Sequence, residues 1–106
     1  MRSLEIINYN NKYHHQFKNI NLHWLNKYEL YEKADDALLN YPNEFIKNGA
    51  TIFLAYLDNK IVGTICINPI NDNSVEILKF AVLDGYKGLG IGTQILQSAL
   101  NFSTVG

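Results

Sequence analysis

A chain of 106 residues is long enough for one small domain with its own hydrophobic core, and we expect residues 1–106 to form a single domain. Nine Lys and Arg residues nearly balance ten Asp and Glu residues, with no basic run, which excludes nucleic acid as the main partner. Hydrophobic residues make up 47% of the chain and aromatic residues 12%, values that exclude intrinsic disorder.

Cysteine content and hydropathy indicate the compartment. No apolar stretch approaches the ~20 residues of a membrane span, and the N-terminus lacks a signal-peptide pattern. Cys66 is the single cysteine, so an internal disulfide is excluded. We therefore expect a cytoplasmic protein without a membrane partner.

The N-terminal segment predicts a strand followed by a helix. Residues 3–8 form a short strand with Leu4, Ile6 and Ile7 as its apolar positions. Large apolar side chains then recur at helical spacing, which predicts an amphipathic helix over residues 11–29, capped by one of the asparagines before it. The three histidines of this helix have no carboxylates at metal-ligand spacing, so we expect no metal site.

Two shorter helices are predicted next. Residues 29–39 form a linker and a short second helix that begins near Asp35. Pro42 suits the first turn of another short helix, Asn43–Lys47, and Gly49 suits its C-terminal exit.

The central segment predicts a β-hairpin. Residues 51–57 and 61–68 are apolar on both faces, which is typical of strands covered by helices on both sides of a sheet. Residues 58–60 form the tight turn between them, and residues 69–74 are predicted to be a polar loop. Cys66 lies within the second strand, where it is expected to be a buried small hydrophobe.

The next segment predicts a strand, a turn and a helix in succession. Residues 75–82 are β-branched and apolar enough to form a strand, and residues 83–86 carry turn chemistry. The following Lys87-Gly88-Leu89-Gly90-Ile91-Gly92-Thr93 opens a helical pattern with glycine at alternate positions. The start of a helix has unpaired N–H groups and a positive dipole end, so this stretch favours binding of a phosphate.

Other glycine motifs fit this stretch less well. A dinucleotide fingerprint is Gly-x-Gly-x-x-Gly, whereas Gly88, Gly90 and Gly92 place the third glycine one residue early. A Walker loop ends in Gly-Lys-Ser/Thr, which is absent here. A tight turn that binds nothing remains the plain structural alternative.

These residues resemble the signature of the Gcn5-related N-acetyltransferase (GNAT) family. That signature is a strand ending in apolar-Ala-Val, a short turn, and Gln/Arg-x-x-Gly-x-Gly/Ala at the start of a helix. Here Phe80-Ala81-Val82 precedes the stretch from Lys87 to Gly92, with Lys87 where Gln or Arg is usual. A lysine side chain suits a phosphate neighbour.

The resemblance implies an α/β fold of the α+β type, in the order β-α-α-β-β-β-α, with a mostly antiparallel sheet flanked by helices. It covers the N-terminal part of the family fold, through the acetyl-CoA-binding motif. The fifth strand and fourth helix of the family would follow residue 106, so we expect a truncated domain in which the strand 75–82 is an exposed edge.

The resemblance also implies acetyl transfer from acetyl-CoA, as co-substrate, to a small-molecule or peptide amine by direct attack. The residues implied for coenzyme A are Ala81, Val82, Lys87, Gly88, Gly90, Ile91, Gly92 and Thr93. The backbone N–H of Val82 is the implied oxyanion donor.

Glu76 is the candidate general base. It stands where some family members keep a catalytic glutamate, and a partly buried carboxylate there would act through water; a structural strand glutamate is the alternative. Lys79 is expected to face outward from the strand. The resemblance implies that the first two helices and their linker form one wall of the acceptor site, with Tyr28, Tyr31, Glu32, Asp35 and Asp36 as candidate residues; a solvated polar face is the alternative.

Three functional hypotheses follow. The chain is an acetyltransferase or its N-terminal piece, a relative that binds coenzyme A or nothing and does not catalyse, or an assembly module. The exposed edge of strand 75–82 predicts a homo-oligomer or a complementary chain as partner.

Overall fold

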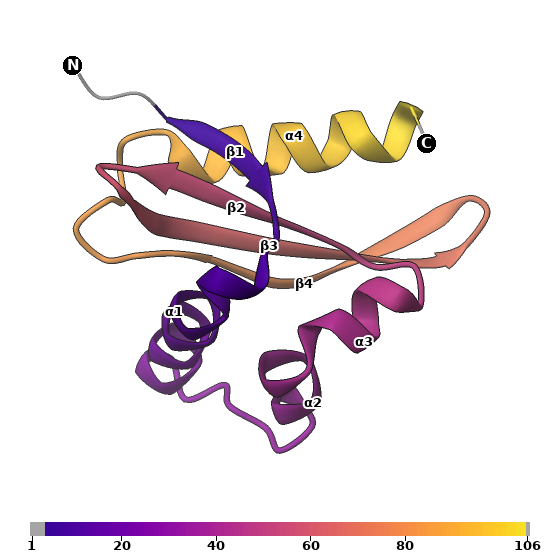
Figure 1. The fold of residues 1–106 in the computed structure, drawn as a ribbon, viewed down its shortest axis with the longest axis horizontal. Helices are drawn as coiled ribbons and strands as arrows, with labels where there is room; N and C mark the ends of the chain where they lie inside the picture. The colour runs from indigo at the N-terminus through magenta and orange to yellow at the C-terminus, as the bar shows by residue number, and fades with distance from the viewer. Residues whose placement is uncertain (1–3, 106) are drawn as a thin grey trace.

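The computed structural model describes residues 4–105, with side chains through residue 101, and shows a four-stranded antiparallel sheet between two helical layers (Figure 1). The strands follow chain order across the sheet: β1 (Glu5–Asn8), β2 (Thr51–Leu57), β3 (Lys60–Asn71) and β4 (Ser74–Val82). This confirms the predicted α+β fold; Ser3, at the predicted start of β1, lies outside the described residues.

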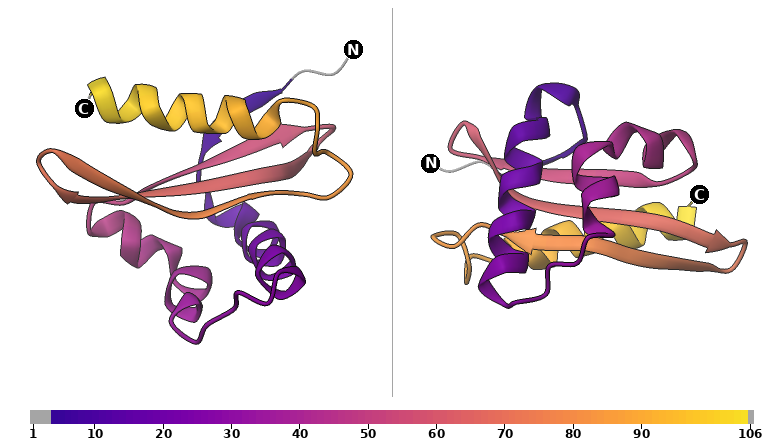
Figure 2. Two further views of the ribbon diagram at one scale, coloured as in Figure 1. Left: turned by 180° about the vertical axis from the view of Figure 1, so that it is seen from behind. Right: turned by 90° about the horizontal axis from the view of Figure 1, so that it is seen from below.

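Helices cover both faces of the sheet. The helices α1 (His14–Lys27), α2 (Asp35–Asn40) and α3 (Pro42–Lys47) lie on one face, and α4 (Ile91–Val105) lies on the other. Seen from below, α1 and the α2–α3 pair run across the strands side by side (Figure 2). Within residues 4–105, no helix combines the length and apolarity needed to cross a membrane.

The two cores explain why β2 and β3 are apolar on both faces. On the α1–α3 side, Leu54 and Cys66 pack in one cluster with Phe17 and Leu39. On the other side, Ile65 belongs to a second cluster with Ile95 of α4. Neighbouring side chains of one strand point to opposite faces and enter different clusters, so both faces are buried, as the sequence pattern predicted.

Local signals set the helix ends. A short 3-10 turn, η1 (Asn11–Tyr13), precedes α1, and Asn10 caps it by accepting a hydrogen bond from the Lys12 N–H at 3.0 Å. Pro42 occupies the first turn of α3, and Gly49 leaves that helix with a φ of +106°. By contrast α4 begins at Ile91, so most of the glycine stretch is a turn that precedes the helix.

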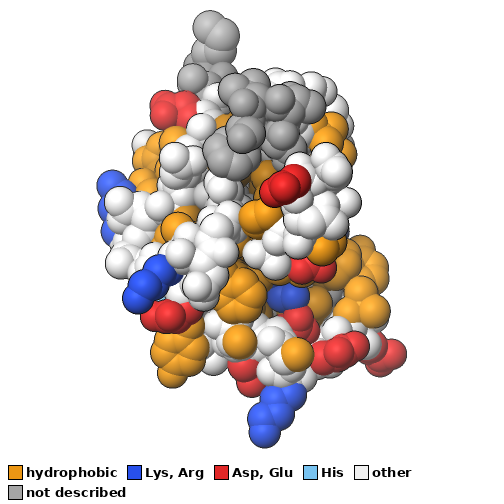
Figure 3. Space-filling view, turned by 90° about the vertical axis from the view of Figure 1, so that its right-hand side faces the viewer, with side chains coloured by type: hydrophobic (Ala, Val, Ile, Leu, Met, Phe, Trp, Pro, Cys, Tyr) orange, Lys and Arg blue, Asp and Glu red, His pale blue; other side chains and the backbone are white. Residues whose placement is uncertain are grey.

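The predicted polar loop over residues 69–74 is wrong. Both strands continue to a tight turn, with Pro69 paired to Val75 and Asn71 paired to Ser74. Pro69 is tolerated in β3 because the pairing of β2 ends at the Thr51–Ile67 pair, so β3 has a free edge beyond it. The extended hairpin leaves Val75 and Ile77 exposed, and Figure 3 shows that side of the molecule with hydrophobic side chains among acidic ones.

A β-bulge interrupts β4 one residue before its buried end. Thr64 pairs with Ala81 and Cys66 pairs with Leu78, so two residues of β4, Lys79 and Phe80, oppose one residue of β3. Lys79 adopts a φ of +48°, in the left-handed region. The bulge directs the Lys79 side chain beneath the α1–α3 layer, which corrects the expectation that it faces outward.

Candidate functional site

The glycine stretch is a turn in left-handed conformations, followed by the first turn of α4. Gly88 and Gly90 have φ values of +83° and +79°, and an added Cβ on either would meet no atom within 4 Å. Backbone conformation, and not packing, therefore requires glycine at these two positions. At Gly92 a Cβ would lie 3.6 Å from Phe80 and Val82, an ordinary contact, so the chain itself leaves room for a side chain there.

These residues line a cavity of about 420 Å³, which we call the loop cavity. The structure brings together around it all eight residues that the resemblance implied for coenzyme A, with Trp24, Phe80 and Tyr86 completing the wall. The N–H groups at the start of α4 precede the first intrahelical bond, from the Gln94 N–H to the Gly90 carbonyl at 3.1 Å. Unpaired donors and a helix dipole thus meet at one end of this cavity.

The outer edge of β4 forms another side of the loop cavity. The Leu83 N–H donates to the Val62 carbonyl of β3 at 2.7 Å. Because successive N–H groups of a strand point to opposite edges, we infer that the N–H of Val82 points to the outer edge. An extended ligand arm in the cavity would meet free backbone groups there.

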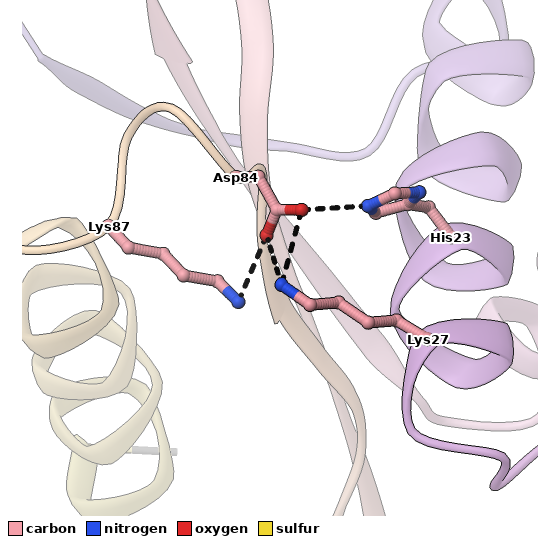
Figure 4. A network of polar contacts seen from close by, with 4 residues as sticks. All are labelled: His23, Lys27, Asp84 and Lys87. Carbon is pink, nitrogen blue, oxygen red and sulfur yellow. Dashed lines mark hydrogen bonds and ion pairs between the residues drawn. The ribbon is translucent and has the colours of Figure 1, made fainter.

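Asp84 joins the glycine turn to α1 (Figure 4). Its carboxylate accepts from His23 at 2.9 Å and from Lys27 at 3.2 Å, and it forms an ion pair with Lys87 at 3.1 Å. The hydrogen bonds from His23, Lys87 and Lys27 hold the pKa of Asp84 well below its usual range. The Asp84 hydrogen bond in turn raises the pKa of Lys87.

This cluster changes the role expected for Lys87. The residue lines the loop cavity, but its ammonium is paired with Asp84, so a phosphate would have to share it or displace Asp84. Sequence reasoning missed Asp84 as a hub, because it was visible only as a turn residue. Its partners on α1 lie about sixty residues earlier in the chain, and no local pattern links them.

A second cavity of about 260 Å³, which we call the Lys79 cavity, lies between α1 and β4. It shares Trp24 and Phe80 with the loop cavity, and its remaining lining residues are Asn21, Leu25, Ile77 and Lys79. Lys79 pairs with Asp35 of α2 at 2.5 Å, and each of the two side chains is 14% exposed. The ion pair ties α2 to the bulge of β4.

The buried polar residue Asn21 supports the bulge from α1. Its amide donates to the Phe17 carbonyl at 2.9 Å and to the Thr64 hydroxyl at 3.0 Å. The Thr64 hydroxyl lies 3.3 Å from the Lys79 carbonyl, to which it donates. Polar groups that would otherwise be buried without partners are thereby satisfied around the irregular backbone.

Glu76 is exposed, and not partly buried as expected, and lines neither cavity. Its carboxylate accepts a hydrogen bond from Asn68 of β3 at 3.0 Å.

Cys66 is fully buried, and burial raises the pKa of its thiol to about 12, which fits the predicted structural role. Among residues 4–105, no three His, Cys, Asp or Glu side chains lie together as metal ligands.

Comparison with known proteins identifies similar chains. Residues 17–104 match the family model described as the acetyltransferase (GNAT) family. The structure is similar to an acetyltransferase of the GNAT family from Staphylococcus aureus Mu50, with a TM-score of 0.85 and 24% identity over 96% of this chain and 66% of that one. An acetyltransferase from Streptococcus agalactiae 2603 has a TM-score of 0.81 and 22% identity, over the same shares of the two chains.

A third solved structure is the PaiA N-acetyltransferase from Thermoplasma acidophilum in complex with coenzyme A. It has a TM-score of 0.76 and 19% identity, over 96% of this chain and 72% of that one. No curated protein matches the sequence. The chain thus spans 66% of the length of the first two structures. Because the identities are below 25%, these structures show that the fold is shared and nothing more.

Proposed function

Because the chain belongs to the acetyltransferase (GNAT) family, we propose that it transfers an acetyl group from acetyl-CoA to a primary amine by direct attack. One observation carries the proposal: the glycine turn, the start of α4 and the outer edge of β4 surround a single cavity. The coenzyme A bound to the Thermoplasma relative supports this cofactor.

In the proposed complex the pyrophosphate of coenzyme A takes the N–H groups of residues 87–93. The left-handed glycines expose those groups, and the helix dipole favours the negative charge. The pantetheine arm then runs along β4 at Ala81 and Val82, paired like an added strand. This arrangement directs the thioester toward Trp24 and Phe80, where the two cavities meet.

The reaction needs a neutral amine. The amine nitrogen attacks the thioester carbonyl, an amide forms as the C–S bond breaks, and the proton that the nitrogen loses goes to the departing thiolate, which leaves as coenzyme A. The Val82 N–H stabilises the developing oxyanion. We keep Glu76 as the proposed base; since it is exposed and lines neither cavity, it would take the ammonium proton through water.

The acceptor is a small-molecule or peptide amine, as in the family. A chain that binds coenzyme A without catalysis is the second candidate, because the proposed base Glu76 is exposed and lines neither cavity. The exposed side chains Val75 and Ile77 on the edge strand β4 support self-association or pairing with a complementary chain.

The single buried thiol, Cys66, fits a reducing compartment such as the cytoplasm.

A glycine replacement tests the proposed phosphate site. Gly90→Glu places a carboxylate at a left-handed position beside the proposed pyrophosphate, so calorimetry should detect acetyl-CoA binding to the wild type and none to the variant. Gly85→Glu is the matched control, because Gly85 lies in the same turn outside the cavity lining, and it should bind as the wild type does. Equal affinity of the three folded proteins for acetyl-CoA would refute the proposed phosphate site. Catalysis is measured separately with a thiol-release assay.

A further inference from the structure

The Lys79 cavity meets the loop cavity at two aromatic side chains. Trp24 of α1 and Phe80 of β4 line both. A ligand in the Lys79 cavity would therefore lie next to the end of any ligand arm that follows β4 through the loop cavity. With about 260 Å³, the space suits a small molecule or one side chain of a peptide.

The walls of the Lys79 cavity are apolar apart from two residues. Trp24, Leu25, Ile77 and Phe80 supply aromatic and aliphatic surface. The polar residue Asn21 has its amide engaged with Phe17 and Thr64, as described above. Lys79 is therefore the one charged residue among those that line the cavity.

The Lys79 ammonium keeps donors for a ligand. An ammonium has three N–H groups, and the ion pair with Asp35 engages one of them. Asp35 is absent from the cavity lining and is held from the other side, where its second oxygen accepts from the Glu32 N–H at 2.9 Å. Asp35 thus holds Lys79 from outside the cavity lining, whereas Lys79 itself belongs to that lining.

We propose that the Lys79 cavity is the acceptor site and selects an amine that carries a carboxylate and an apolar body, as in a free amino acid. This rests on the proposed acetyl transfer. Lys79 binds the carboxylate through a charge-assisted hydrogen bond, and the apolar walls hold the side chain. The acceptor ammonium stays on the side of Trp24 and Phe80, toward the thioester.

Charge outside the cavity agrees with a zwitterionic ligand. Glu32 and Glu76 are exposed on the α2 and β4 sides of this region and Asp36 of α2 is partly exposed, so the three carboxylates attract an ammonium toward the entrance. Inside, a second ammonium on the ligand would meet Lys79 and be repelled. A polyamine is therefore a poorer ligand than an amino acid.

The test uses tryptophan fluorescence. Trp24 is the single tryptophan and lines both cavities, so its emission reports ligands in either one. L-phenylalanine and phenethylamine differ only in the carboxylate, and each is titrated with and without saturating coenzyme A. The wild type should bind L-phenylalanine about tenfold or more tighter than phenethylamine, the range of one charge-assisted hydrogen bond, and tighter than spermidine.

Three variants test whether the charge of Lys79 causes the preference for L-phenylalanine over phenethylamine. Lys79→Met should bind the two probes equally, and Lys79→Arg should keep the preference for L-phenylalanine and show that the fold survives replacement. Lys33→Met removes a lysine that is exposed between α1 and α2 and should behave as the wild type. Equal wild-type affinities, no binding of L-phenylalanine, or tighter binding of spermidine would each overturn the inference. Loss of coenzyme A binding alone would instead count against the proposed function.

Discussion

Replacing Gly63 by alanine tests how closely α4 packs on the sheet. Gly63 lies in the middle of β3, and a Cβ built there would stand 2.5 Å from the Cδ1 of Ile95. Ordinary van der Waals contacts begin at 3.4 Å, so the two carbon atoms would overlap by almost one ångström. Ile95 is fully buried, which limits its freedom to turn away. Gly63→Ala should therefore push α4 from the sheet or force Ile95 off its rotamer.

The expected loss of unfolding free energy is about 1–3 kcal/mol, the usual result of overpacking a core. Alanine also reduces the entropy of the unfolded chain, which offsets about 0.4–1 kcal/mol of that loss. Chemical denaturation followed by circular dichroism measures the balance. Gly85→Ala is the control, because a Cβ there meets nothing within 4 Å, and it should stay within about 0.5 kcal/mol of the wild type.

A double-mutant cycle identifies the clashing atom. Ile95→Val removes Cδ1 and alone should cost about 0.5–1.5 kcal/mol. Combined with Gly63→Ala it should recover at least about 1 kcal/mol of the summed losses, because the new methyl group then fills the vacated space. Additive losses, or a Gly63→Ala variant more stable than the wild type, would refute this description of the α4 contact.

Two further predictions concern Asp84 and β4. Because its partners lower the pKa of Asp84 in the folded protein, the stability it provides should be present above the unfolded-state value of ~3.9 and lost as the pH falls below it. The difference in unfolding free energy between wild type and Asp84→Asn should therefore shrink in acid, and a difference independent of pH would contradict this. Light scattering across a concentration series should show self-association of the wild type and a monomer for Ile77→Lys, whose charge on the edge strand opposes strand pairing. Equal association of both would place the contact elsewhere.

Local chemistry made much of the fold predictable. The strand 51–57 has the bounds that its apolar run indicated, and Pro42 and Gly49 delimit α3 as their backbone preferences require. The eight residues implied for coenzyme A also converge on one cavity, because the strand–turn–helix order keeps them close in the chain. Their role remains a prediction.

Contacts between segments that lie far apart in the chain could not be predicted from the sequence pattern. The loop predicted at Pro69 was wrong because a proline at a free strand edge is compatible with pairing on the other edge. Lys79 was expected outside because a strand alternates, and the bulge that breaks this alternation has no glycine to mark it. Its partner Asp35 comes from another layer of the fold, as do the α1 partners of Asp84.

The chain-ordered sheet also has a consequence for folding. Each strand pairs with the next one in the sequence, so no strand has to insert between two that are already paired. The hairpins β2–β3 and β3–β4 close over tight turns, whereas β1 reaches β2 only after the segment from Asn8 to Thr51 has been brought back. Closing the longer loop loses more chain entropy, so we expect the hairpins to form first and β1 to join late. During synthesis β1 would then leave the ribosome first and wait, unpaired, for β2.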